Sequence, residues 1–181
     1  AAFYSADYFA DYPPGYILVL GLVSLVRKAL QLSYESRWTY FLLALIPAIC
    51  DCAAVVLLDH ISSRRYMGQG RAQRCLVLFA AFCPLTLFDT GIWKQIDGAF
   101  ALPLLLCFWL LEERRYLLAA VLYGVALAIK PQALLAGPVL AVCFMVAIAD
   151  AVRDGKSPLK SVGQIFGGAA LALLPPLLAG L

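Results

Sequence analysis

The sequence predicts an all-α bundle of helices that crosses a membrane several times. Hydrophobic residues make up 64% of the 181-residue chain and charged residues 14%, whereas a soluble domain has roughly half and about a quarter. The apolar residues form runs separated by short basic loops, and no polar stretch is long enough for a soluble domain. Because helices satisfy their own backbone hydrogen bonds in lipid, these runs predict helices. The net charge of +3 is spread over the loops, so we expect no nucleic-acid partner.

The chain opens with a tyrosine-rich segment that contains D-Y-P-P-G-Y. Aromatic residues of this kind mark a membrane interface, and the two prolines hold Asp11 and Tyr12 in an extended lead-in. The apolar run from Gly15 to Val26 follows and ends at Arg27 and Lys28. About 12 residues of helix cover roughly 18 Å of a hydrocarbon core of about 30 Å, so we expect an interfacial or re-entrant helix near the N-terminus.

The run from Tyr40 to Leu58 is long enough to cross a membrane and contains Pro47 and Asp51. We expect the proline to kink this helix. A carboxylate near the middle of a spanning helix costs about 3 kcal/mol by insertion scales, so Asp51 needs either a polar partner or a function. The sequence leaves two roles open for it, a hydrogen bond to a neighbouring helix and contact with a substrate.

The segment from His60 to Arg74 carries four arginines and is the strongest basic loop of the chain. By the positive-inside rule it is cytoplasmic, and it orients everything after it. The residues from Asp89 to Asp97 and from Lys130 to Gln132 then face the exterior. Charges next to the first run break this pattern, namely Arg27, Lys28 and Arg37. The later runs, which we expect to cross in alternating directions, are Cys75 to Phe88, Gly98 to Leu111, Tyr116 to Ile129, Ala133 to Ile148 and the stretch from Val162 onward.

Polar residues gather between two of these runs, in the sequence F-D-T-G-I-W-K-Q-I-D-G from Phe88 to Gly98. If the stretch is helical, Asp89, Trp93 and Asp97 recur every four residues and share one face. One interpretation is a polar cavity at the membrane boundary. The other is an interfacial turn with a tryptophan anchor and a pair between Lys94 and Asp97.

A second polar corner is Lys130-Pro131-Gln132. Pro131 ends one helix at Lys130 and suits the first turn of the next, whose free N–H groups together with the ammonium group would bind an anion such as a phosphate. The alternative is that Lys130 only extends its ammonium group to the membrane interface, as lysines at helix ends commonly do.

Metal and cofactor chemistry find no support in the sequence. The six cysteines lie within or at the edges of apolar runs without a C-x-x-C pair, and the one histidine, His60, lies beside basic residues. We interpret the cysteines as small packing residues. Because these residues lack the spacing of a zinc site, we expect no zinc site. That no metal and no cofactor are needed is implied only by the family resemblance given next.

Four motifs in a fixed order resemble the N-terminal half of the GT-C superfamily of membrane glycosyltransferases. They are D-Y-P-P from Asp11, the proline-containing helix with Asp51, D-x-G-x-W-x-Q-x-D from Asp89, and G-x-A-x-x-x-K-x-Q from Gly124. The chain is similar to bacterial members and, more distantly, to glucosyltransferases that use dolichyl-phosphate-glucose. The family's first membrane helix and its C-terminal half are not in this sequence. We therefore expect residues 1–181 to form a single transmembrane domain that is a fragment of a longer module.

The resemblance implies an enzyme that moves a sugar from a polyprenyl-phosphate carrier to a lipid or glycan acceptor hydroxyl, with inversion. It implies a multi-pass protein of a bacterial cell membrane, in contact with membrane lipids and active on the external face. Asp11 occupies the position of the family's catalytic base, and Lys130 with Lys94 would stabilise the leaving phosphate. The residues expected to bind substrate are Tyr12, Asp51, Asp89, Trp93, Lys94, Gln95, Asp97, Lys130 and Gln132.

The main alternative is a secondary transporter or flippase, in which Asp51 and Asp97 would bind a substrate or a coupling ion near the midplane of the membrane. A transporter needs its polar residues at the centre, with access from both sides, whereas this enzyme needs them at one face. The polar motifs lie mostly at the ends of apolar runs, which favours the enzyme. A non-catalytic membrane scaffold would leave the polar corners without a purpose.

Overall fold

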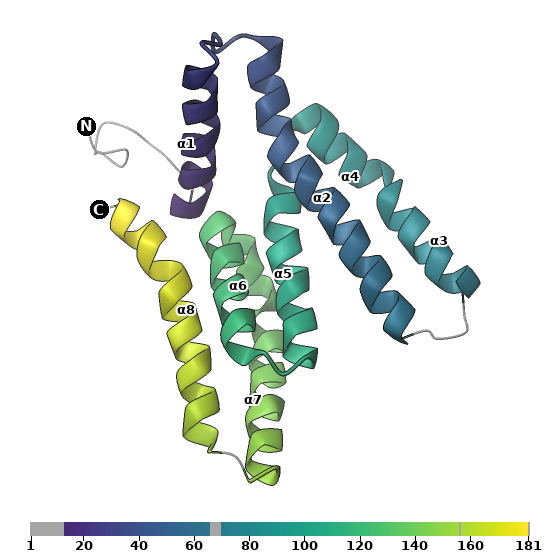
Figure 1. Cartoon of the computed structure of the whole chain (residues 1–181), viewed down its shortest axis with the longest axis vertical. Coiled ribbons are helices and arrows are strands. Elements are labelled where there is room, and N and C mark those ends of the chain that lie inside the picture. Colours follow the sequence, from purple (N-terminus) through teal and green to yellow (C-terminus); the bar gives the residue numbers. More distant parts are fainter. Residues whose placement is uncertain (1–12, 66–69, 156, 181) are drawn as a thin grey trace. The chain divides into compact units, whose positions relative to one another are not determined.

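Helices account for all the regular structure of the described residues, which are 13–65, 70–155 and 157–180 of a computed structural model (Figure 1). The predicted all-α class is confirmed. In chain order the elements are α1 (Pro14–Ala29), α2 (Arg37–Arg65), α3 (Gly70–Ala81), α4 (Pro84–Phe88), the π-helix η1 (Asp89–Trp93), α5 (Asp97–Glu112), α6 (Tyr116–Ile129), the 3-10 helix η2 (Pro131–Ala136), α7 (Gly137–Arg153) and α8 (Pro158–Gly180).

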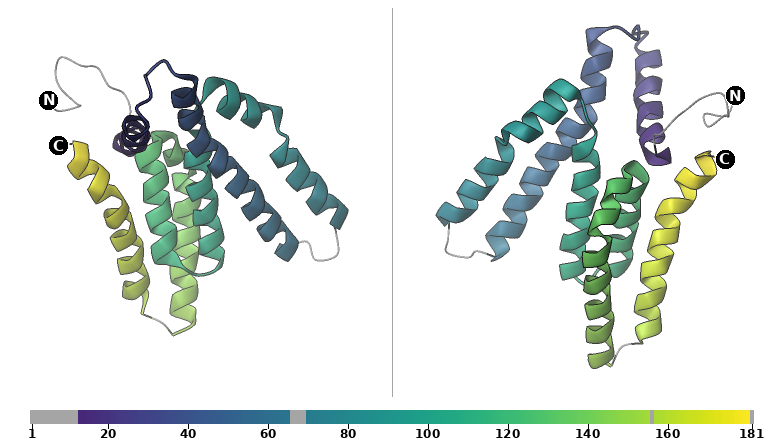
Figure 2. Two further views of the ribbon diagram at one scale, coloured as in Figure 1. Left: turned by 45° about the horizontal axis from the view of Figure 1, so that its top comes forward. Right: turned by 180° about the vertical axis from the view of Figure 1, so that it is seen from behind.

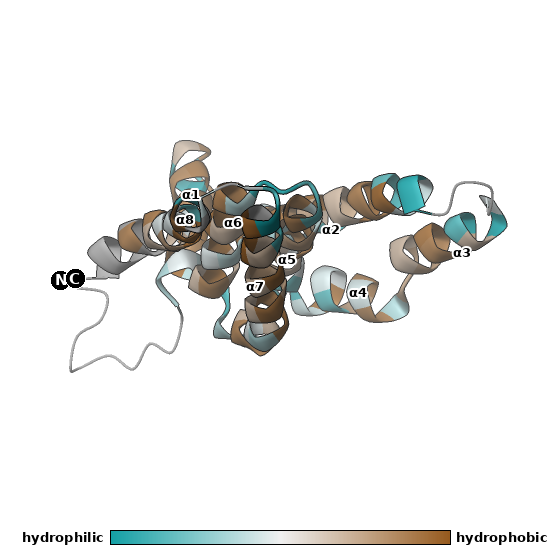
Figure 3. Ribbon diagram, turned by 90° about the horizontal axis from the view of Figure 1, so that it is seen from below, coloured by the Kyte–Doolittle hydropathy of each residue, from teal (hydrophilic) through white to brown (hydrophobic). Residues whose placement is uncertain are grey.

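The length and polarity of these helices suit a membrane. Three stretches are long and apolar enough to cross one, namely Arg37–Arg65, Gly70–Trp93 and Pro131–Asp150. Large apolar side chains such as Phe79 and Leu85 are 71% and 80% exposed, which lipid tolerates because its tails are as apolar as leucine. Figure 3 shows apolar colour along most helices and polar colour where α2 ends and α3 begins. The chain is an integral membrane protein.

The basic segment between the first long helices is not the loop that the sequence predicts. α2 continues to Arg65 and α3 starts at Gly70, so most of the predicted loop is helical. Arginine is a good helix former, and its long side chain reaches water from the end of a helix, so the charges do not end the backbone hydrogen bonding. The amide Nε2 of Gln73 on α3 donates a hydrogen bond of 2.8 Å to Oδ1 of Asp59 on α2. This bond connects the two helices near the basic segment.

Other predicted boundaries hold more closely. α6 has the predicted bounds, and α5 exceeds the predicted run by one residue at each end. α1 is longer than predicted, because it continues through Lys28 to Ala29. Its 16 residues still fall short of the ~20 that a spanning helix needs. The interfacial or re-entrant role of α1 remains a prediction.

The chain forms two compact units. The middle unit is Leu20–Leu102, and the terminal unit combines Ala1–Val19 with Pro103–Leu181. In the middle unit α2 and α3 lie side by side in every view (Figures 1 and 2). A single transmembrane domain over the whole chain remains a prediction.

In the terminal unit, small residues let α6 and α8 pack closely. A methyl group at Gly124 would lie 2.5 Å from Cβ of Ala172, and one at Gly168 would lie 2.6 Å from the carbonyl oxygen of Leu117. Close approach over small residues is how helices gain packing energy in lipid, where no hydrophobic force draws them together. Beside this pair, a buried cluster joins α5, α6 and α7 through Cys107, Leu110, Ala119 and Leu140.

The turn between α1 and α2 uses one of the basic residues that break the charge pattern. The guanidinium group of Arg27 donates to the carbonyl oxygen of Leu32 at 2.7 Å and lies 3.7 Å from the ring centroid of Tyr34. The buried hydroxyl of Thr39 donates to the carbonyl oxygen of Ser33 at 2.7 Å. Arg27 therefore closes this turn, a local role that a charge-counting rule does not consider.

Candidate functional site

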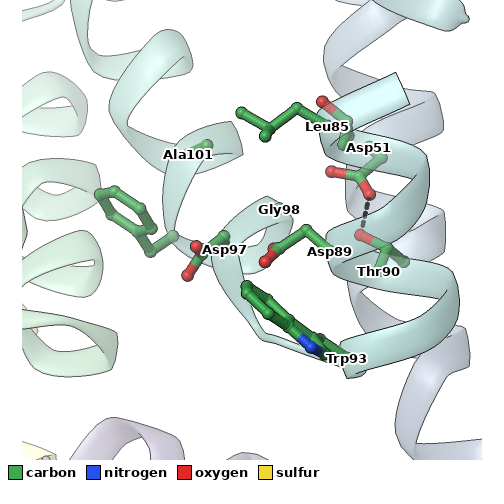
Figure 4. A pocket seen from close by; sticks show the side chains of 10 residues that line it. Asp51, Leu85, Asp89, Thr90, Trp93, Asp97, Gly98 and Ala101 are labelled. Carbon is green, nitrogen blue, oxygen red and sulfur yellow. Dashed lines mark hydrogen bonds between the residues drawn. The ribbon is translucent and has the colours of Figure 1, made fainter. Parts of the chain in front are cut away.

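A cavity of about 400 Å³ lies in the middle unit, where α2, α4, η1 and the first residues of α5 meet (Figure 4). Its size falls within the range of about 300–1,000 Å³ of small-molecule sites. Three carboxylates and an indole ring border it, and no lining residue is basic. The lining residues are Asp51, Leu85, Thr86, Asp89, Thr90, Trp93, Asp97, Gly98, Phe100 and Ala101.

The polar wall of the cavity is built on η1. α4 starts at Pro84, which suits the first helical position because it has no N–H group to leave unpaired. After Phe88 the helix widens into a π-helix, a form that occurs mostly as single turns and frequently at functional sites. The N–H groups of Lys94 and Gln95 both donate to the carbonyl oxygen of Asp89 and close this turn.

The chain reverses at Lys94, whose backbone is left-handed with φ 55° and ψ 37°. This conformation ends the helix and lets α5 start in a new direction at Asp97. The ammonium group of Lys94 lies 5.6 Å from the ring centroid of Tyr40 on α2, within the range of a cation–π contact, and 3.5 Å from the carbonyl oxygen of Ile92.

Asp51 connects the long helix α2 to this wall. Its Oδ2 accepts a hydrogen bond of 2.5 Å from the hydroxyl of Thr90, which is only 7% exposed. On its other side stands Gly98, where a methyl group would overlap the Asp51 carboxylate and lie 2.8 Å from the carbonyl oxygen of Pro47. Three segments of the chain therefore meet at one carboxylate.

Trp93 forms the rim of the cavity. Its side chain is 67% exposed, and its ring meets that of Phe88 edge to face with centroids 5.3 Å apart. This contact holds the indole ring in place, while most of the side chain stays accessible. Figure 4 shows Asp89, Asp97 and Trp93 bordering the same space.

Four of the predicted substrate-binding residues thus share one cavity, namely Asp51, Asp89, Trp93 and Asp97. The predicted reason, one helical face with a four-residue repeat, is wrong, because the chain reverses between Trp93 and Asp97. The other predicted residues lie elsewhere. Lys94 and Gln95 lie in the adjoining turn, Lys130 and Gln132 belong to the terminal unit, and Asp11 and Tyr12 lie outside the described residues.

The lysine-proline corner has part of the predicted form. Lys130 follows α6 with an extended backbone, φ −145° and ψ 119°, and its N–H group donates to the carbonyl oxygen of Ala126 at 2.9 Å. Pro131 starts a helix as predicted, but this is the six-residue 3-10 helix η2, and α7 begins only at Gly137. The side chain of Lys130 is half-buried and that of Gln132 is exposed.

Sequence reasoning missed the residues that hold the cavity together. Thr90 lies in the polar stretch but carries no charge, so the charged and aromatic residues around it were chosen instead, and Gly98 was taken as the first residue of a membrane run. A signal was present in each case. Thr90 directly follows Asp89, and Gly98 directly follows Asp97 at a helix start, where the absence of a side chain allows another helix to approach.

Metal ligands do not gather in the part of the chain that the structure describes. No three side chains of His, Cys, Asp or Glu there are grouped closely enough to hold an ion. All six cysteines are free, and Cys107 is fully buried in the cluster of the terminal unit. Its neighbours are apolar, which is the surrounding expected of a packing residue.

Apolar helices that expose leucine and phenylalanine to lipid, and that enclose carboxylates and a tryptophan at one cavity, define an integral membrane protein with a polar binding pocket. The chain matches the family model of glycosyltransferase family 87 over residues 9–180, and it belongs to that family. Comparison with curated proteins and with solved structures gives no match. The family is of the GT-C type, so the predicted resemblance is confirmed, and membership of the family supports a membrane glycosyltransferase.

Proposed function

We propose that the chain is part of a multi-pass bacterial enzyme that transfers a sugar from a polyprenyl phosphate to a hydroxyl of a lipid or glycan acceptor. The observation that carries the proposal is the cavity of the middle unit, where Asp89 and Asp97 lie beside the exposed ring of Trp93. A glycosyltransferase must hold a hydroxyl-rich sugar, and this cavity has the groups for it.

The chemistry of the cavity fits the sugar and not the phosphate of the donor. Carboxylate oxygens accept hydrogen bonds from sugar hydroxyls, and the flat face of an indole covers the apolar face of a sugar ring. A phosphate next to three carboxylates would be repelled, and no lining residue carries a positive charge to offset this. The phosphate therefore needs a cation outside the cavity lining, and our candidates, chosen from the sequence motifs alone, are Lys130 and Lys94.

Transfer with inversion needs one base and one stabilised leaving group. We assign the base to Asp11 from its position in the D-Y-P-P motif. Its carboxylate takes the acceptor proton while the acceptor oxygen forms a bond to the anomeric carbon. The bond from that carbon to the phosphate oxygen breaks on the opposite side, and the polyprenyl phosphate leaves with the electron pair. A lysine ammonium stabilises the charge that develops there.

The charge pattern supports an external site. Arg64 and Arg65 end α2, and Asp51 lies 14 residues earlier on the same helix. A helix rises 1.5 Å per residue, so the carboxylate lies about 21 Å from the basic end. If the basic end is cytoplasmic, the chain runs outward from it through α3 and α4 to Asp89, so the wall formed by η1 lies at the external end of that crossing.

The test is a transfer assay with the full-length protein in proteoliposomes. Donors are a panel of polyprenyl-phosphate sugars and the corresponding nucleotide sugars, and acceptors are membrane lipids and short glycans. We expect transfer from polyprenyl-phosphate donors only, with the opposite anomeric configuration in the product. Transfer is compared between donor sealed inside the vesicles and donor added outside them. The comparison shows on which face of the membrane the enzyme uses its donor.

Variants at two positions test the roles proposed for Asp11 and Trp93 in this assay. Asp11→Asn should abolish transfer, because an amide cannot take the acceptor proton. Trp93→Ala should weaken donor use, and Trp93→Phe should restore part of it. Transfer from nucleotide sugars without a lipid-linked donor, or full activity of Asp11→Asn, would contradict the proposal.

A further inference from the structure

The helix α2 contributes one side chain to the polar wall of the cavity, and that side chain is already engaged by the protein. Oδ2 of Asp51 accepts the hydroxyl hydrogen of Thr90 at 2.5 Å. Oδ1 faces Gly98 so closely that a methyl group there would overlap it. Oδ2 is therefore bonded to another segment of the chain, and Oδ1 lies against Gly98 at the edge of the cavity that Asp51 helps to line. A carboxylate that binds sugar hydroxyls would need its oxygens directed into the open space.

The two partners of Asp51 stand next to the residues that border the cavity. Thr90 directly follows Asp89 in η1, and Gly98 directly follows Asp97 at the start of α5. Between them the chain reverses through the left-handed Lys94. A reversal of this kind has two ends that can move relative to each other, and Asp51 holds both ends against α2.

From this junction we propose that Asp51 is a positioning residue. Through Thr90 and Gly98 it sets the separation and direction of Asp89 and Asp97, and it makes no contact with the substrate. The inference rests on the proposed function, in which these two carboxylates bind the sugar. Hydrogen bonds that position binding groups contribute to rate because a catalytic site loses efficiency when its groups are misplaced by about 1 Å.

The experiment separates the hydrogen bond from the negative charge. Thr90→Val keeps the shape and removes the hydroxyl, whereas Thr90→Ser keeps the hydroxyl. Asp51→Ala removes the acceptor, whereas Asp51→Asn keeps an oxygen acceptor without the charge. We expect Thr90→Val and Asp51→Ala to lower kcat/KM for the donor by about tenfold or more, and Thr90→Ser to stay within about threefold of the parent. Asp51→Asn should lose less than Asp51→Ala.

A double variant tests whether the two residues act as one. If Asp51 acts through Thr90, the combination of Asp51→Ala with Thr90→Val should lose no more activity than the worse single variant. The matched control is Gln73→Leu, which removes a side-chain hydrogen bond between α3 and α2, from Gln73 to Asp59, away from the cavity. This variant should lower thermal stability by no more than Thr90→Val does, because water can replace the exposed bond, and it should leave kcat/KM unchanged.

Three results would overturn the inference. The first is Asp51→Asn losing as much activity as Asp51→Ala while Thr90→Val stays active, since the charge would then act on the substrate. The second is additive losses in the double variant. The third is an equal loss of kcat/KM in Gln73→Leu and Thr90→Val, which indicates stability alone. If the proposed sugar-binding role of the cavity is wrong, the pattern is different. Trp93→Ala and Asp89→Asn then keep the kcat/KM of the parent for the donor, as do the variants of Asp51 and Thr90.

Discussion

Adding one methyl group at Gly98 should loosen the junction between α2 and α5. The methyl carbon of Gly98→Ala would lie 2.8 Å from the carbonyl oxygen of Pro47, where ordinary contact begins at 3.4 Å. α5 must therefore move by about 0.6 Å at this point, the difference between those two distances. The methyl group would also overlap the Asp51 carboxylate, so that side chain must turn away and give up its bond to Thr90.

The magnitude follows from two costs and one gain. Overpacking a tight site costs about 1–3 kcal/mol, and loss of the hydrogen bond costs about 1 kcal/mol more in a membrane interior. Alanine is favoured over glycine in a helix by about 1 kcal/mol. The net loss is about 1–3 kcal/mol, which lowers Tm by about 2–12 °C for a chain of this size.

Thermal unfolding in detergent micelles, followed by circular dichroism, measures this change. Gly91→Ala is the matched control, because Gly91 lies seven residues earlier and its methyl group would meet nothing within 4 Å. The control should be as stable as the parent or slightly more so. A Gly98→Ala protein with the Tm of Gly91→Ala would refute the reasoning. The activity of Gly98→Ala should fall as well, because the positions of Asp89 and Asp97 change.

Two further predictions concern single backbone positions. Gly168→Ala should lower Tm by several degrees, because the added carbon would meet the backbone of Leu117. Its neighbour Gly167→Ala, which faces open space, should not; equal values for the two variants would contradict the packing of α6 against α8. Lys94→Gly should be more stable than Lys94→Ala by about 1 kcal/mol, since both remove the ammonium group but only glycine adopts φ 55° without cost. Chemical denaturation of the two variants measures the difference, and an equal or higher stability of Lys94→Ala would contradict the left-handed turn.

Composition and periodic runs were sufficient to predict the class of fold. Apolar runs in lipid have few alternatives to a helix, so the bounds of α6 follow directly from the residues. The ends of α2 cannot be predicted from the apolar run in this way, because a change of polarity does not end a helix. The backbone continues its hydrogen bonding through Arg64 and Arg65 while their side chains reach for water.

The candidate site could be predicted in part. Charged and aromatic residues between two apolar runs stand out, so Asp89, Trp93 and Asp97 were found. The π-helix and the left-handed turn were not, since both depend on where the hydrogen bonds of one short segment go and not on polarity. Thr90 and Gly98 are important because both lie against Asp51. Asp51 precedes Thr90 by 39 residues, so a local sequence pattern cannot reveal the contact.

The length of α2 has a consequence for the environment in which the enzyme works. Its 29 residues extend about 43 Å, well beyond the thickness of about 30 Å of an average hydrocarbon layer. Such a helix tilts, or carries its ends out of the lipid, to a degree that depends on the acyl chains around it. Because Asp51 ties this helix to both ends of the turn, a thinner or thicker bilayer changes the geometry of the cavity. Acyl-chain length thereby becomes a variable of sugar transfer.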